Sequence, residues 1–408
     1  MKRLLFAGLL AVATAAQAGN AVYSEKVKTL QAVVNQDWLS PQVMKLGGDV
    51  LNVSFDELSH DYHRYVYRIE HCEYDWAPSD DIFDSDWLEG FNSNPIDDYE
   101  TSLNTTILYT HYRFSIPNER CRLKMSGNYR LHIVDEDTDN EVALVEFRVT
   151  DQTMGVNIGV TTNTDIDVNR SHQQVTMVVR FNGARVTRPE EQIRTVVMLN
   201  AREDNMKEGV RPNFVTADGM RWEHNRGLIF DGGNEYHKFE VLDVTHPTMG
   251  LDRMVWDGGS YQAYPFTDTP RRNYVYDEDA NGAFYIRNSD NTENDRTCEY
   301  VYVNYKLQPA PRYAGAHIMV DGRWATAKPD TYVMTYDSSD NSYNARILQK
   351  QGYYSYQYVM RDFDGTVHPL PEEGSFAETE NQYQALVYYK GTGERTWRLT
   401  AYQQIKFK

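Results

Sequence analysis

Short runs of alternating apolar and polar residues recur along this chain, and turn-forming dipeptides separate them. For example, Leu51, Val53 and Phe55 alternate with Asn52 and Ser54. A period of two places one face of a strand in a core and the other in water. Asn-Gly and Asp-Gly supply the positive φ angles that tight turns need, and they occur at 182–183, 218–219, 231–232, 257–258, 281–282, 321–322 and 364–365. We therefore predict an all-β protein of two to three antiparallel β-sandwich domains in tandem.

Local signals refine this picture. The best helical signal is 84–91, where Asp84 or Ser85 is placed to cap a single turn that carries Trp87 and Leu88. The clearest hairpin is predicted over 178–186, with the Asn-Gly pair at its centre.

Two positions divide the chain into domains. A predicted strand over 141–149 ends the first block, and Pro309-Ala310-Pro311 forms a linker, because two prolines so close together cannot continue a central strand. We place the domains at 19–150, 151–308 and 309–408, each of sandwich size.

The first eighteen residues have the order of a secretory leader. Lys2 and Arg3 precede an apolar run from Leu4 to Ala15, and Ala16-Gln17-Ala18 stands before Gly19. This order predicts a signal peptide over 1–18 that is cleaved before Gly19. Because the apolar run is too short to span a bilayer, the mature chain is expected to be soluble and exported through the Sec route.

The charge of the chain excludes some partners. The formal net charge is −18, and loss of Lys2 and Arg3 with the leader takes it to −20. An anionic surface repels phosphate backbones and anionic lipid. We therefore expect neither nucleic-acid binding nor direct membrane insertion.

Three cysteines, Cys72, Cys121 and Cys298, are too few for a disulfide framework in a chain of this size. A Cys72–Cys121 bridge and two buried free thiols are both compatible with the sequence.

Two clusters contain residue types that bind metal ions. His63 and His71 share a strand face near Cys72 but stand eight residues apart, and closed zinc sites have tighter spacing. The carboxylates from Asp135 to Glu146 match part of a calcium loop, yet strands flank them, which favours an acidic hairpin tip with Glu146 inside a strand. We found no nucleophile elbow, zinc-protease helix or phosphate-binding glycine loop, and therefore predict no catalytic, cofactor-binding or metal residue and no enzymatic activity.

A set of spaced motifs is more specific than composition. In the first third they are 54–58 (SFDEL), 71–76 (HCEYDW), 88–91 (LEGF), 97–99 (DDY), 109–112 (YTHY) and 126–129 (SGNY), and later 350–356 (KQGYYSY), 374–376 (GSF) and 379–383 (TENQY). Together they resemble the plug proteins of the type IX secretion system of Bacteroidetes, with 19–150 as the first plug-family β-domain.

This resemblance implies a role that residue chemistry does not reveal. Plug proteins are periplasmic partners of the giant outer-membrane translocon barrel (SprA/Sov type). They seal its periplasmic mouth when it is not engaged in export, and their binding is expected to be mutually exclusive with that of PorV. The implied location is the periplasm, at the inner side of the outer membrane.

Aromatic residues of the motif region are the candidates for partner binding. We single out Trp76, Trp87, Phe91 and Tyr99, because aromatic side chains in irregular segments are frequent in interfaces. Core packing is the competing interpretation for each of them.

An alternative function is an exported carbohydrate-binding or glycan-processing β-sandwich protein. Tyr354, Tyr356 and Tyr358 share one strand face, and an exposed strip of rings there would stack on sugars.

Overall fold

The computed structural model describes residues 19–408, so the predicted signal peptide at 1–18 lies outside the described residues. Strands dominate, which confirms the all-β prediction. The helices of the described chain are α1 (Asp84–Trp87), α2 (Pro189–Gln192) and α3 (Asn294–Thr297), with the 3-10 turns η1 (Arg226–Leu228) and η2 (Pro329–Tyr332). None of the helices within 19–408 has the length and apolar character to cross a membrane.

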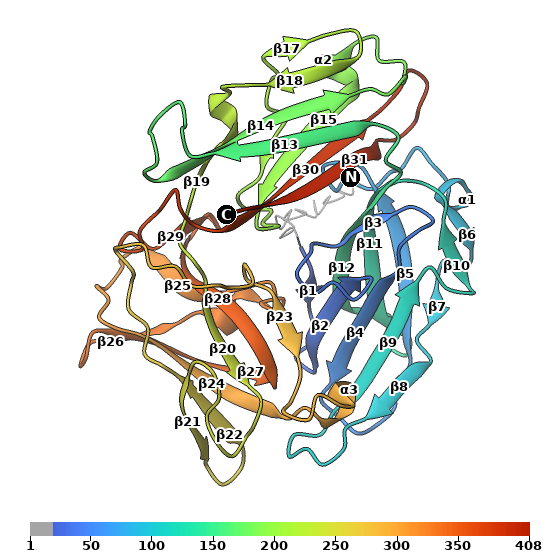
Figure 1. The fold of residues 1–408 in the computed structure, drawn as a ribbon. Coiled ribbons are helices and arrows are strands. Elements are labelled where there is room, and N and C mark those ends of the chain that lie inside the picture. Colours follow the sequence, from blue (N-terminus) through green and yellow to red (C-terminus); the bar gives the residue numbers. More distant parts are fainter. Residues whose placement is uncertain (1–18) are drawn as a thin grey trace, which may run out of the picture.

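Unit 1 comprises residues 19–151 and occupies the right-hand side of Figure 1. One sheet contains β1 (Ala21–Val22), β3 (Val43–Lys45), β5 (Tyr65–Cys72), β7 (Asn94–Pro95), β11 (Gly127–Asp135) and β12 (Asn140–Thr150). The other contains β2 (Val27–Val34), β4 (Leu51–Glu57), β8 (Asp98–Thr101) and β9 (Thr110–Ile116), and a small ladder joins β6 (Leu88–Gly90) to β10 (Cys121–Leu123). Alternate residues of both sheets, such as Phe55, Leu131 and Phe147, fill one core.

Unit 2 lies at the top of Figure 1 and combines green and red strands. Its first sheet contains β13 (Gly155–Thr161), β14 (His172–Arg180), β17 (Phe214–Val215), β18 (Gly219–Trp222) and β19 (Ile229–Asp231). Its second contains β15 (Ile193–Leu199), β16 (Lys207–Glu208), β30 (Asn381–Tyr389) and β31 (Arg398–Phe407). The core between them includes Val179, Val197, Trp222 and Val387.

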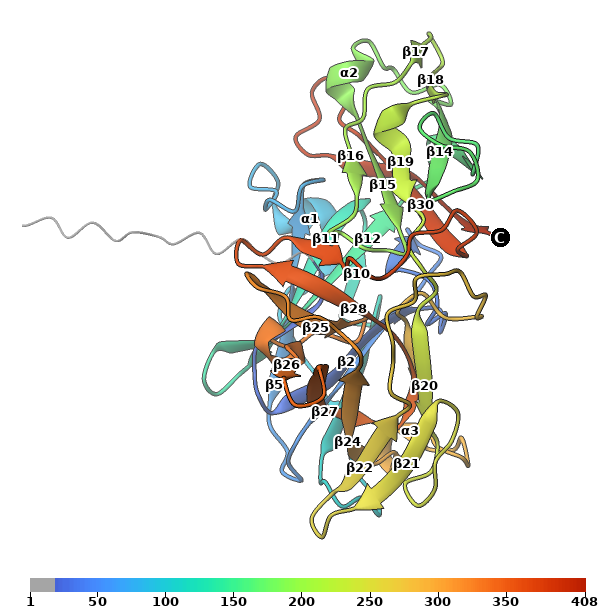
Figure 2. The same ribbon diagram turned by 90° about the vertical axis from the view of Figure 1, so that its left-hand side faces the viewer.

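Unit 3, residues 232–380, lies at the lower left of Figure 1. One sheet contains β20 (His237–Val241), β23 (Phe284–Ile286), β25 (Ala316–Asp321), β28 (Gly352–Asp362) and β29 (Val367–Pro369). The other contains β21 (Leu251–Trp256), β22 (Tyr261–Pro265), β24 (Tyr300–Leu307), β26 (Thr335–Asp337) and β27 (Ser342–Lys350). Phe239, Val303 and Tyr305 are central in its core. Figure 2 shows that units 2 and 3 lie one above the other.

The expected boundary between 308 and 309 does not divide the cores, and we correct it. β24 pairs along its whole length with β27 across that point, and β30 pairs with β15. Unit 2 is therefore discontinuous, with unit 3 inserted between β19 and β30. Pairing between strands that are far apart in the sequence produces no local sequence pattern, so the boundary at 308 could not be recognised. The boundary at 150 coincides with the end of β12.

Two local predictions had different outcomes. The single helical turn is found as α1, although Leu88 already belongs to β6. The hairpin over 178–186 is wrong. Asn182 and Gly183 do have positive φ angles, +48° and +86°, but β14 pairs with β13, β18 and β19. The turn instead leads the chain toward β15 in the other sheet.

Because unit 2 is formed by two separate segments of the chain, we can predict which fragments fold. A fragment of residues 152–308 lacks β30 and β31, so β15 keeps only the two-residue strand β16 as a neighbour. It also lacks β27 and β28, so β24 keeps only β22, and β20 and β23 lose the strand that joins them. We expect this fragment to be unfolded, and the fragment 152–408 to be folded. Dispersion of amide signals in NMR spectra distinguishes the two. A folded 152–308 fragment would contradict the assignment of one core to both segments.

Candidate partner-binding surface

The structure separates the four aromatic candidates into two buried and two exposed residues. Trp87 ends α1 and is 3% exposed. Its ring meets the ring of Tyr129 edge-on, with centroids 5.7 Å apart. Trp76 is 8% exposed, and the guanidinium of Arg148 lies 4.8 Å from the centroid of its ring. Burial favours core packing over partner contact for both tryptophans.

Phe91 is 75% exposed, and the structure adds a second exposed ring, that of Phe83, at 74%. A hydrogen bond of 2.9 Å from the side chain of Asn92 to Asp84 Oδ2 ties together the segments that carry these rings. We call Phe83 and Phe91 the phenylalanine patch. Sequence reasoning missed Phe83, although an aromatic residue between Asp81 and Asp84, outside any alternating run, is a signal for an exposed ring.

Glycine holds the patch in place. Gly90 has a φ of +104°, and a Cβ there would lie 2.1 Å from the carbonyl oxygen of Arg120. Any side chain at this position would push β6 away from β10. The backbone N–H of Phe91 donates to the same carbonyl at 3.0 Å, so this close approach fixes where Phe91 leaves the sheet.

Tyr99 is 41% exposed and stacks on Tyr62, with ring centroids 4.5 Å apart. It belongs to the edge strand β8 at the lower right of Figure 1, whereas α1 and β6 lie at the upper right. The two exposed candidates therefore mark different ends of unit 1, not a single surface.

Other residues of the motifs join unit 1 to unit 2. Glu73 accepts a hydrogen bond from the backbone N–H of Trp397 at 2.9 Å. The ring of Trp397 meets that of Tyr74, with centroids 5.2 Å apart. The Tyr388 hydroxyl donates to Asn128 at 2.8 Å. Much of the 71–76 and 126–129 motifs is thus used inside the chain.

A buried ionic group joins unit 1 to unit 3. Lys350 Nζ lies 2.8 Å from Asp56 Oδ2, and both side chains are 1% exposed. The Tyr300 hydroxyl donates to the same oxygen at 2.6 Å, and His111 Nδ1 lies 2.6 Å from the other. The Lys350 ammonium also lies 4.0 Å from the centroid of the Tyr109 ring. We call these five residues the unit 1–3 lock, and sequence reasoning did not connect them.

The lock changes the acidity of Asp56. Burial alone would raise the pKa of this carboxyl group, but the Lys350 charge and the His111 hydrogen bond outweigh burial and hold the pKa below its ordinary value. A lowered pKa in the folded chain means that the contribution of the lock is complete above about pH 4. It disappears as the pH falls through the lowered pKa.

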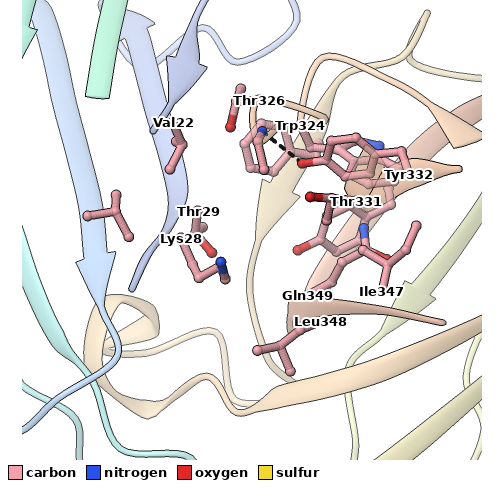
Figure 3. Close-up of a pocket in the computed structure, with 14 residues that line it drawn as sticks. Val22, Lys28, Thr29, Trp324, Thr326, Thr331, Tyr332, Ile347, Leu348 and Gln349 are labelled. Atoms are coloured by element: carbon pink, nitrogen blue, oxygen red, sulfur yellow. Dashed lines mark hydrogen bonds between the residues drawn. The ribbon is translucent and has the colours of Figure 1, made fainter. Parts of the chain in front are cut away.

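A cavity of about 80 Å³ remains between units 1 and 3. Figure 3 shows Lys28 and Thr29 of β2 on one side and Trp324, Tyr332 and Gln349 on the other. Sites for small molecules are typically about 300–1,000 Å³. This cavity is a packing gap at the junction, too small for such a ligand.

The residues of the two candidate metal clusters make contacts within the fold. His63 Nδ1 lies 2.6 Å from Glu57, and His71 Nδ1 lies 2.8 Å from the Ser79 hydroxyl, so each ring has a polar partner within unit 1. The stretch after Asp135 is the tip of the β11–β12 hairpin, and Glu146 lies inside β12. Within 19–408 no group of three or more His, Cys, Asp or Glu is placed to hold a metal ion.

The three cysteines are buried and free, which decides the open question of a disulfide. Burial is the main cause that raises the thiol pKa of Cys72 and of Cys298 to about 12. At neutral pH these thiols are therefore protonated and unreactive.

The tyrosine strip that motivated the carbohydrate alternative is not at the surface. Tyr354, Tyr356 and Tyr358 are 2%, 2% and 4% exposed. The hydroxyls of Tyr356 and Tyr358 both donate to Asp268, at 2.7 and 2.6 Å. Buried rings cannot stack on a sugar. The structure therefore removes the feature that motivated the carbohydrate-binding alternative.

Comparison with known proteins identifies the chain. The family profile described as "Type 9 secretion system plug protein 1st domain" matches residues 27–151. The chain belongs to the type IX secretion system plug family. The matched residues coincide with unit 1, which contains the phenylalanine patch and the unit 1 side of the lock. Membership indicates a plug role related to type IX secretion and a location in the cell envelope.

A solved structure extends the likeness to all three units. The crystal structure of a hypothetical protein from Parabacteroides merdae ATCC 43184 is 31% identical, with a TM-score of 0.91 over 95% of this chain and 99% of that chain. A DNA glycosylase from Pseudomonas fluorescens, AlkC, is 13% identical over 30% of each chain. With a TM-score of 0.16, it supports no inference about the plug protein. No curated protein matches.

The lock predicts the effect of one substitution. Lys350→Met leaves the Asp56 carboxylate buried without its counter-ion, which costs about 3–5 kcal/mol. The control is Lys306→Met, because Lys306 pairs with Asp340 at 2.6 Å in a half-exposed position, where a pair contributes about 0–1 kcal/mol. Urea unfolding followed by tryptophan fluorescence measures both. Equal midpoints for the two variants would contradict the role assigned to Lys350.

Proposed function

We propose that this protein is a non-catalytic periplasmic plug, which binds and seals the periplasmic mouth of the type IX translocon barrel when the barrel is not engaged in export. The family match over residues 27–151 carries this proposal. Occlusion needs shape and stiffness and no reacting group. A pore wide enough for folded cargo would leak solutes when empty, and a bound protein body prevents this.

The way the three units are joined supports a stiff body. Unit 1 is tied to unit 3 by the buried lock, and to unit 2 by the contacts of Trp397 and Tyr388. Arg323 of unit 3 donates to the carbonyl oxygens of Leu39 and Ser40 in unit 1, at 2.8 and 2.7 Å. Separating any of these units would expose unpaired charge or polar groups, which is costly. The units are therefore expected to move together.

The phenylalanine patch is our candidate for the contact with the barrel. Two exposed aromatic rings on segments that are tied together form an apolar patch of the kind that marks interaction sites, whereas a single exposed ring does not. Exposed acidic residues flank the two rings in the sequence, namely Asp80, Asp81, Asp84 and Glu89, and of these Glu89 faces Arg122. A partner with apolar pockets and a basic rim would complement it, and such charge pairing accelerates association at low salt.

Substitution of the patch tests this assignment. Phe83→Asp and Phe91→Asp, alone and together, should keep the fold and weaken capture of the translocon barrel by at least ~10-fold, because each removes an aromatic anchor. Phe363→Asp is the matched control, since Phe363 is 76% exposed but belongs to unit 3. Binding to barrel solubilised from outer membranes gives the affinities. If only the control variant loses binding, the contact surface lies on unit 3.

Deletion of the gene tests the sealing role. Without the plug, the outer membrane should admit large antibiotics, and only while the translocon barrel is present. The barrel should co-purify with either this protein or PorV, but not with both together. Unchanged permeability after deletion, or a barrel that never co-purifies with this protein, would contradict the proposed function.

A further inference from the structure

A row of charged residues crosses the large sheet of unit 1. The strand register places Arg130 opposite Glu146 on β12 and opposite Glu70 on β5, so the three side chains share one face. β1 pairs with the other side of β12, with Ala21 opposite Leu144. Continuing this antiparallel register by two residues puts Gly19 opposite Glu146. Gly19 is thus the fourth position of the row.

The carboxylate of Glu146 is held between Gly19 and Arg130. Glu146 is 6% exposed, and its Oε2 accepts the backbone N–H of Gly19 at 2.6 Å. Its Oε1 accepts from Arg130 Nε at 3.0 Å. The backbone N–H of Glu146 donates to the side chain of Asn20 at 3.0 Å. The nitrogen of Gly19 therefore has a formed, largely dry site.

The surroundings of this site lack one positive charge. Burial would lower the pKa of His132, but Glu141 and Glu70 outweigh burial and raise it to about 9, so the imidazole is charged at neutral pH. Two neighbouring ion pairs compensate themselves: Arg148 pairs with Glu203, and Arg68, opposite His132, pairs with Asp139. The remaining row has two cations against three carboxylates, namely Arg130 and His132 against Glu70, Glu141 and Glu146.

We propose that removal of residues 1–18 supplies the missing charge, and that the α-ammonium group of Gly19 is a structural ion of the mature protein. Hydrolysis by a signal peptidase breaks the C–N bond between Ala18 and Gly19. The hydroxyl of water goes to the Ala18 carbonyl carbon, and the Gly19 nitrogen takes the remaining proton of the water. The new Ala18 carboxyl group releases a second proton, which makes the Gly19 amine an ammonium group. The same nitrogen in the uncleaved chain is an uncharged amide with a single N–H.

This ion would hold a strand at a junction of units. β1 has only two residues, Ala21 and Val22. The backbone N–H of Val22 donates to the carbonyl oxygen of Thr326 in unit 3 at 2.7 Å. A charge on Gly19 anchored by Glu146 therefore fixes a segment that touches both unit 1 and unit 3.

The test compares chains that differ only at the amino terminus. One begins at Gly19, and the other carries one added alanine before it, which turns the Gly19 nitrogen back into an amide. We expect the thermal midpoint of the first to be higher by about 1–2 °C, the shift that one ion pair of moderate strength produces in a chain of this length. The difference should vanish in Glu146→Gln. It should persist in the control Glu136→Gln, whose carboxylate is 40% exposed and pairs with Arg64.

A second readout measures the amine itself. The ordinary pKa of an α-amino group is about 7.7–8.0, and a buried carboxylate partner raises it. Acylation of Gly19 at pH 8, quantified by mass spectrometry against surface lysines, should be at least ~10-fold slower than in Glu146→Gln. If Glu146→Gln fails to fold, the proposal is still tested by comparing the chain that begins at Gly19 with the chain that carries the added alanine. A mature chain that starts elsewhere than Gly19, or equal midpoints for the two termini, would overturn the proposal.

Discussion

A single buried carboxylate, Asp56, determines how the first and third units of this protein meet. Its charge is removed from water by both units at once, so each unit must provide partners: His111 from the first, and Tyr300 and Lys350 from the third. If the two units separated, the Asp56 carboxylate and the Lys350 ammonium would each lose their partner. The geometry between the units is therefore specified by directional contacts, whereas an apolar contact of the same size would tolerate sliding.

Tyrosine provides much of the remaining cohesion, which explains why thirty of them occur in the chain. Each ring buries a large apolar area, and each hydroxyl can form a hydrogen bond with a polar group that would otherwise be buried without a partner. Tyr388 does this across units 1 and 2, and Tyr300 across units 1 and 3. Tyr356 and Tyr358 do the same inside unit 3 by satisfying Asp268. The many tyrosines in this chain therefore serve contacts within and between the units.

Sequence patterns predicted what depends on nearby residues. Period-two alternation predicted strands, the Asn-Gly pair predicted the positive φ angles at Asn182 and Gly183, and the predicted strand over 141–149 lies inside β12. Partnerships between distant strands were missed, because alternation says which face is buried but not against what. No local signal joins Asp56 to Lys350, 294 residues away. Of the four candidate site residues, composition could not tell buried Trp76 and Trp87 from exposed Phe91 and Tyr99.

The insertion of one unit into another also governs the order in which the chain can fold. β15 is made early, but its partner β30 follows almost two hundred residues later, after the whole of unit 3. Unit 1 can close its core while the rest of the chain is still emerging, whereas unit 2 has to wait for the last strands. Contacts of such long range form slowly. A truncated chain would thus reach its compartment with an open sheet edge, and only the full-length chain can become a closed body.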